Sequence, residues 1–110
     1  MDIEAEDAKL VTLAKASRAR IGAEAGAAVR DQDGRTYTAA SIAREHLTIS
    51  ALDLAVAMAI SSGASSLEAA ALASEEDMVV DLAAVREFAQ DSAVIVYASP
   101  AGHIREVVSL

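Results

Sequence analysis

The first residues that could do chemistry together are a histidine and a serine four positions apart, His46 and Ser50. Residues four apart share one face of a helix, so the imidazole could act as the base that activates the serine hydroxyl as a nucleophile. Such a pair also needs a third group that orients the base, and the neighbouring sequence offers none. The favoured interpretation of Ser50 is therefore an ordinary polar residue at a helix start.

Acidic residues offer a second possible chemistry. Asp53, Asp77 and Asp81, together with His46, could form an oxygen-rich site for Mg²⁺ or Mn²⁺ if the fold brought them together. The alternative gives each acid a separate role: Asp77 in the first turn of a helix, Asp81 at the surface and Asp53 in an ion pair. We favour the separate roles and treat the metal site as the alternative.

The composition excludes several functional classes. The chain has no cysteine, so thiolate nucleophiles, disulfides and cysteine-bound metals are impossible. A net charge of −8 argues against binding nucleic acids or anionic membranes, although five arginines lie in the first half, where we expect them to be solvated. These are Arg18, Arg20, Arg30, Arg35 and Arg44. The acidic first residues do not resemble a signal peptide and no apolar stretch could span a bilayer, so we expect a cytoplasmic protein.

The segment over residues 47–60 is the most apolar part of the chain and is predicted to be a central helix ending near residue 62. Its apolar side chains occupy nearly every face, so we expect protein to cover it on all sides. Asp53 is its only charged residue. Because a buried carboxylate is costly unless it is paired, we expect Asp53 to pair with an arginine, either within the chain or across an interface.

The remaining elements follow from local patterns. Acidic residues early and basic residues late predict a first helix over residues 2–20. The Asp33-Gly34 turn predicts a hairpin between strands at 24–30 and 35–40. Further along we predict a buried strand at 67–74, a helix at 78–89, a strand at 93–98 and an edge strand at 103–110. Alternating helices and strands indicate an α/β domain with helices on both faces of a sheet.

Four short motifs, in this order and at these separations, resemble those of the small homotetrameric cytidine deaminases. They are Gly26–Val29, Asp33–Thr38, Leu47–Ile49 and Arg86–Ala89. They match the family's V-G-A-A-L strand, D-G-R-x-[YF]-T hairpin, L-T-x-C-A-E helix start and terminal E-F. The resemblance implies one domain over residues 1–110, with a three-layer α/β/α fold around a mixed five-stranded sheet.

The positions that would carry the family's chemistry hold other residues. Family members bind zinc through three protein ligands, and a glutamate beside the first ligand shuttles protons. The resemblance places the three ligands at Ser50, Met78 and Asp81, and the proton shuttle at Leu52. Serine, methionine and aspartate suit a tetrahedral zinc ion poorly, so we expect a degenerate site without metal or other cofactor.

The positions that would recognise a nucleoside also differ from the family pattern. The N-x-E motif that reads ribose and base falls at Ser41–Ala43, and the phenylalanine that stacks on the base falls at Ala23. The proline that precedes the second zinc ligand falls at Asp77. Each of the family's roles at these positions is therefore expected to be lost.

Three functions follow from the resemblance and the altered positions. The leading prediction is a non-catalytic homo-oligomer, a dimer or a tetramer, that serves as a scaffold or binds an unidentified protein partner. The resemblance places the central helix at the subunit interface, where Asp53 could pair with an arginine. The first alternative is a metal-free protein that binds a nucleoside or another small metabolite in a degenerate pocket. An active hydrolytic cytidine deaminase is the weakest alternative.

Overall fold

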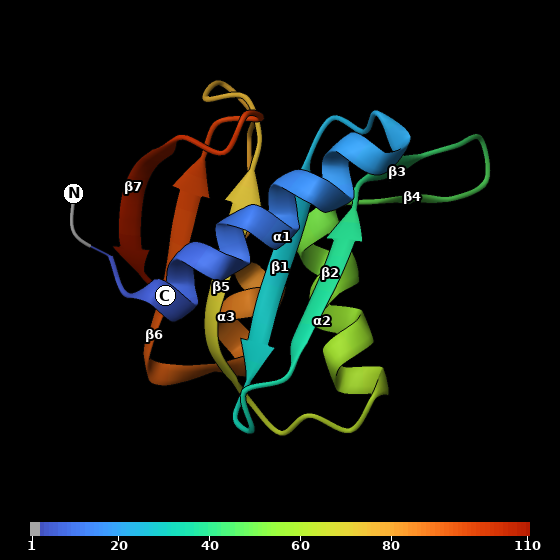
Figure 1. Cartoon of the computed structure of the whole chain (residues 1–110). Coiled ribbons are helices and arrows are strands. Elements are labelled where there is room, and N and C mark those ends of the chain that lie inside the picture. The colour runs from blue at the N-terminus through green and yellow to red at the C-terminus, as the bar shows by residue number, and fades with distance from the viewer. Residues whose placement is uncertain (1–2) are drawn as a thin grey trace.

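The core of the fold is a mixed five-stranded sheet, seen here in a computed structural model that describes residues 3–110. Across the sheet, the strands are β2 (Thr36–Ala40), β1 (Gly26–Asp31), β5 (Leu67–Ala73), β6 (Ala89–Ala98) and β7 (Ile104–Ser109) (Figure 1). Strands β5 and β6 run parallel, and the other neighbours are antiparallel. The predicted mixed sheet is confirmed.

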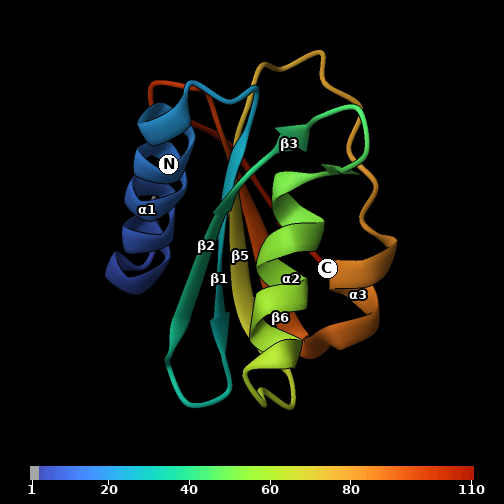
Figure 2. The ribbon, with the colours of Figure 1, turned by 90° about the vertical axis from the view of Figure 1, so that its right-hand side faces the viewer.

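Helices cover both faces of this sheet. Helix α1 (Ala5–Ile21) lies on one face, and helices α2 (Ala51–Ser61) and α3 (Ala83–Phe88) lie on the other (Figure 2). The apolar core is correspondingly divided into two layers, one around Leu10 and Ala14 and the other around Leu52 and Val56. The three-layer α/β/α architecture predicted from the sequence is therefore confirmed.

Helix α1 approaches the sheet very closely. Glu6 and Asp7 lie in its first turn and Arg18 and Arg20 in its last, an order that complements the helix dipole. A Cβ atom at Gly26 in β1 would collide with the carbonyl oxygen of Ala14, so only glycine fits there. The helix predicted over residues 2–20 is present, but it begins at Ala5, after the N-cap Glu4, and ends at Ile21, and Asp2 lies outside the described residues.

The predicted hairpin joins β1 to β2 and contains a buried carboxylate. Gly34 has a φ of 82°, which a glycine adopts without strain. The side chain of Asp31 accepts hydrogen bonds from the Tyr37 hydroxyl (2.9 Å) and from the backbone N–H groups of Asp33 and Arg35 (2.9 and 3.0 Å). Burial opposes ionisation, but these three donors hold the pKa of Asp31 below its ordinary value.

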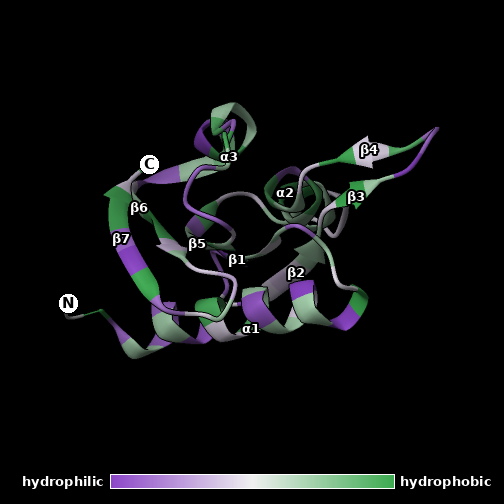
Figure 3. Ribbon diagram, turned by 90° about the horizontal axis from the view of Figure 1, so that it is seen from above, coloured by the Kyte–Doolittle hydropathy of each residue, from purple (hydrophilic) through white to green (hydrophobic). Residues whose placement is uncertain are grey.

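The central helix begins later than the sequence predicted. Ser50 is its N-cap and accepts a hydrogen bond from the backbone N–H of Asp53 (3.0 Å), so α2 starts at Ala51 instead of residue 47. The β-branched residues Thr48 and Ile49 form strand β4 (Thr48–Ile49), which pairs with β3 (Ile42–Ala43). This ribbon and its loop project from the body of the molecule as an arm (Figure 3).

The prediction that protein covers the central helix on all sides is wrong for the single chain. Met58 and Ile60 are 39% and 49% exposed on its outer face, whereas Leu52, Ala55, Val56 and Ala59 are buried. One side of the helix therefore packs on the sheet, and Met58 and Ile60 lie on the two flanks of its exposed side, because residues two positions apart point in nearly opposite directions on a helix.

The predicted helix over residues 78–89 is also too long. Helix α3 covers only Ala83–Phe88, and residues 75–82 form a loop. The backbone N–H of Ala83 donates to Asp81 Oδ1 (2.9 Å), which gives the helix its start. Val79 and Val80 are β-branched and disfavour an earlier helical turn. Strand β6 begins at Ala89, four positions before its predicted start, whereas β5 and the edge strand β7 lie where they were predicted.

Among residues 3–110, no helix is both long and apolar enough to cross a membrane.

We predict that Asp31→Asn lowers the free energy of unfolding by about 1–3 kcal/mol at pH 7, because a neutral amide weakens the hydrogen bonds that the carboxylate accepts. Since folding lowers the pKa of Asp31, its stabilising effect is present above about pH 4 and is lost as the pH falls through the folded-state pKa. Denaturant unfolding at pH 7 and pH 3 measures both effects.

The control for this prediction is Asp91→Asn, because Asp91 is exposed. We expect this variant to unfold like the wild type at both pH values. A difference between Asp31→Asn and wild type that stays constant down to pH 3 would contradict the proposed role of the ionised carboxylate.

Candidate functional site

A cavity of about 800 Å³, called here the main cavity, opens at one end of the sheet. It lies where the end of α1, the β3–β4 arm, the start of α2 and the loop over residues 75–82 come together. Its lining consists of residues 21–25, 41–44, 48–52, Leu72 and residues 78–81. Segments far apart in the sequence therefore meet at one site, with a volume typical of small-molecule sites.

The four positions that the sequence analysis assigned to the zinc ligands and the proton shuttle all line this cavity. Ser50 and Leu52 reach it from the start of α2, and Met78 and Asp81 reach it from the loop before α3. Met78 and Asp81 do so without the predicted helix, because residues 75–82 form a loop at the same place.

The positions expected to have lost nucleoside recognition also lie in the main cavity. Ala23 and the segment 41–43 contribute to its wall, whereas Asp77 does not. The structure thus brings together the ligand, shuttle and recognition positions that the resemblance indicated, although the residues now at these positions are different.

Three of the cavity's polar side chains, those of Ser41, Ser50 and Asp81, bond to backbone within the chain, and the charged side chains of Glu24 and Arg44 also line it. Ser50 Oγ accepts from Asp53 N (3.0 Å), and Asp81 Oδ1 accepts from Ala83 N (2.9 Å). Ser41 Oγ bonds to both the N–H (3.1 Å) and the carbonyl oxygen (3.3 Å) of Ala25. These oxygens hold backbone in place, so few of them are available for a bound molecule.

The side chains now at the ligand positions do not fit a zinc ion. Zinc sites in proteins are built from cysteine sulfur, histidine nitrogen and carboxylate oxygen, and only Asp81 belongs to that group. Ser50 serves as a helix cap, and the thioether of Met78 is a ligand for softer metals.

The other chemistry suggested by the sequence is not assembled. The side chain of His46 is 91% exposed on the arm, 4.0 Å from Glu45 Oε2, and it does not line the main cavity with Ser50. Asp53 and Asp77 lie outside this cavity as well. Within residues 3–110, no three His, Asp or Glu side chains form a group that could hold a metal ion, so the Mg²⁺ or Mn²⁺ site gains no support.

Asp53 has no ion-pair partner among the described residues. Its Oδ1 atom is buried and accepts no hydrogen bond there. The arginine expected beside Asp53 is thus not supplied by residues 3–110.

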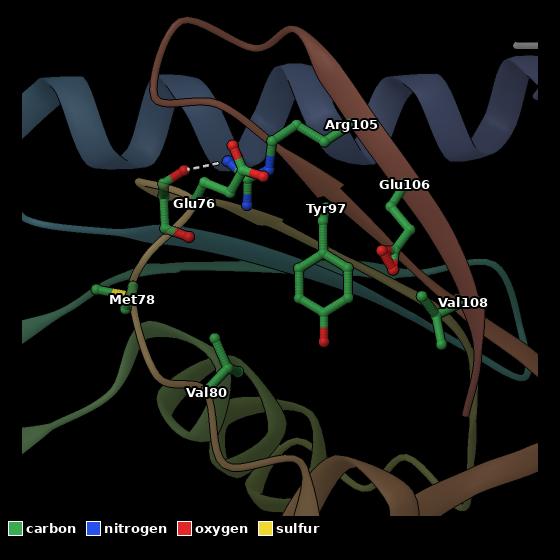
Figure 4. Close-up of a pocket in the computed structure, with 8 residues that line it drawn as sticks. Glu76, Met78, Val80, Tyr97, Arg105, Glu106 and Val108 are labelled. Atoms are coloured by element: carbon green, nitrogen blue, oxygen red, sulfur yellow. Dashed lines mark hydrogen bonds between the residues drawn. The ribbon is translucent and has the colours of Figure 1, made fainter.

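A second hollow, of about 460 Å³, lies on the other side of the loop over residues 75–82 (Figure 4). Met78 and Val80 line both hollows, so this loop is their common wall. Arg105 donates to the carbonyl oxygens of Ser74 (2.6 Å) and Ala98 (3.1 Å) at its edge. Burial raises the pKa of Tyr97, whose ring also lines this space. This hollow was not predicted, because residues 78–82 were expected to be helical.

A third hollow, of about 710 Å³, surrounds an ion-pair chain that joins α1 to the sheet. Arg30 in β1 donates to Asp7 Oδ1 of α1 (3.0 Å) and to Glu68 Oε2 of β5 (2.9 Å). Both carboxylates bind the same guanidinium, so the role of this cluster is to hold α1 and β5 to β1.

A family model described as cytidine deaminase-like matches residues 3–102. The chain belongs to the cytidine deaminase-like family. A comparison with curated proteins finds no significant match.

Two solved structures share the fold. The cytidine deaminase from Burkholderia pseudomallei is 21% identical, with a TM-score of 0.75 over 92% of this chain and 90% of its own. The cytidine deaminase from Mycobacterium leprae is 16% identical, with a TM-score of 0.66 over 94% of this chain and 93% of its own. At these identities, the likeness concerns the fold and does not extend to the activity.

We predict that Leu52→Ala lowers the free energy of unfolding by about 2–5 kcal/mol, because Leu52 is 1% exposed and its removal enlarges a void in the core. The matched control is Leu47→Ala, which makes the same change on the exposed arm and should alter stability by less than about 0.5 kcal/mol. Denaturant unfolding measures both variants. Equal losses would show that Leu52 is not a core residue.

Proposed function

We propose that this protein is a non-catalytic member of the cytidine deaminase-like family that acts as a homo-oligomer, either as a scaffold or as a protein-interaction module. One observation carries the proposal: the positions expected to hold zinc and shuttle protons meet in the main cavity, but they are occupied by Ser50, Leu52, Met78 and Asp81. Hydrolytic deamination in this family needs a metal-activated water and a carboxylate beside it.

The residues at these four positions do not supply these two functions. Leu52 is apolar and carries no proton, and it is packed in the core. Asp81 could supply one metal ligand, but its Oδ1 already accepts a backbone hydrogen bond. We therefore infer that the chain has kept the fold of the family and has lost its reaction.

The outer face of α2 supports assembly into an oligomer. Met58 and Ile60 expose apolar surface there, and burying it against another subunit would be favourable by about 25 cal/mol per Å². Asp53 lies on the same helix with a buried oxygen that lacks a partner within residues 3–110. An arginine from a neighbouring subunit would satisfy that oxygen.

The open main cavity favours a second candidate function. A volume of about 800 Å³ is large enough for a metabolite, so the protein could bind a small molecule without converting it. This function is compatible with oligomer formation, because the two use different parts of the surface. The cytoplasmic location inferred from the sequence stays a prediction.

We expect the purified protein, supplied with Zn²⁺, to form no detectable uridine from cytidine, because a metal-activated water and its proton shuttle are both missing. A coupled assay for released ammonia measures the reaction, and native mass spectrometry measures bound metal. A turnover that disappears in Asp81→Ala but persists in Asp33→Ala, an exposed control, would overturn the non-catalytic proposal.

We expect Asp53→Ala to shift the oligomer toward smaller species, because the substitution removes the carboxylate that would pair across the interface. Light scattering coupled to size-exclusion chromatography measures the mass, with Asp91→Ala as the exposed control. If the protein is a monomer, removing the half-buried Asp53 side chain, whose buried Oδ1 has no partner within residues 3–110, should instead raise its melting temperature. An unchanged mass together with a higher melting temperature would therefore refute the interface role.

A further inference from the structure

We propose that the main cavity binds an uncharged, largely apolar small molecule, and that it discriminates against polar and anionic ones. This inference rests on the second candidate function above and adds the chemical class of the ligand. It depends on three properties of the cavity: its apolar inner wall, the bonding of its polar side chains and the charge around it.

The inner wall of the cavity is apolar and built largely from small side chains. Ala25, Ala51, Leu52 and Leu72 line the cavity and are buried in the fold, so their side chains offer a bound molecule hydrocarbon. Met78 in the loop adds a flexible thioether that adapts to ligands of different shapes. Binding an apolar molecule on this wall removes hydrocarbon surface from water on both partners.

The hydroxyl groups of the cavity favour the same class of ligand. Ser41, Ser50 and Thr48 each bond to backbone, the last by donating to the carbonyl oxygen of Arg44 (3.2 Å). Each donor or acceptor of a buried polar ligand that found no partner here would cost about 1–3 kcal/mol. A ligand without such groups avoids this penalty.

Charge disfavours anions in particular. Glu24 and Asp81 lie at the cavity against one arginine, Arg44, and the whole chain carries a net charge of −8. The charge of the cavity lining is therefore negative, like the net charge that sets the long-range field of the protein. This field would repel an anionic ligand, whereas it would not affect the binding of an uncharged ligand.

The rim of the cavity carries two exposed aliphatic side chains beside its charged ones. Ile21 and Val79 line the cavity and are 64% and 96% exposed. Exposed aliphatic groups at the edge of a hollow are typical of binding sites for apolar partners. Because Ile21 ends α1 and Val79 lies in the loop before α3, the two residues belong to different segments of the rim.

The test uses two fluorescent probes that share one apolar body. N-phenyl-naphthylamine is uncharged, and anilinonaphthalene sulfonate carries an added sulfonate. We expect saturable binding of the uncharged probe at one site per chain, with an affinity about tenfold or more above that of the sulfonate. Excess cytidine should not displace it, because the cavity offers few free polar partners to a nucleoside.

Site-directed variants assign the binding to the main cavity. Ala23→Trp places a large side chain in the wall and should weaken probe binding about tenfold or more, whereas Ala19→Trp, on the exposed surface of α1, should leave it unchanged. If Ala23→Trp does not fold, Thr48→Trp fills the cavity from the arm.

Three results would overturn the inference: no saturable binding of the uncharged probe, equal or tighter binding of the sulfonate, or identical binding by Ala23→Trp and Ala19→Trp. None of them concerns the deaminase assay or the oligomer mass. Failure of this inference is therefore distinguishable from failure of the proposed function.

Discussion

The structure depends on the close contact between α1 and the first strand of the sheet. Gly26 lies against the carbonyl oxygen of Ala14, and no side chain fits between them. The neighbouring positions of β1 and β5 are mostly alanine, which keeps the helix near the sheet along its length. Because α1 is fixed in this way, the residues after it, Gly22 to Ala25, are held at the wall of the main cavity.

The same alanine-rich packing explains why a cavity is present at all. Small side chains on the sheet and at the start of α2 fill less volume than the leucines and phenylalanines of an ordinary core. Where several short side chains face one another between the sheet and the segments that cover it, they do not fill the space between them. Ala23, Ala25 and Ala51 meet at one end of the sheet, and this is where the main cavity lies.

The parts of the fold that could be predicted from the sequence are those with local causes. The hairpin at the Asp-Gly turn and the strand β7 near the end of the chain depend on neighbouring residues, and both were predicted correctly. The start of α2 was not, because Ser50 competes as a cap against the apolar run that precedes it. The start of α3 was not either, because the valines before it favour an extended chain.

The candidate site shows a similar division. The resemblance identified which positions would meet, since their relative places follow from the order of the elements. It could not show that these positions would surround open space, because volume depends on the sum of many side chains from separate segments. Nor could it show that Ser41, Ser50 and Asp81 would bond to backbone, because those contacts depend on turns and caps one or two residues away.

The buried polar atoms without partners indicate where the single chain is incomplete. Within residues 3–110 they are Arg18 Nε, Arg30 Nη1 and Asp53 Oδ1, and none of these residues lines the main cavity. Asp53 lies on the helix that also exposes Met58 and Ile60. The unsatisfied carboxylate and the uncovered apolar surface occur on one element, so a neighbouring subunit that covers α2 could satisfy both at once.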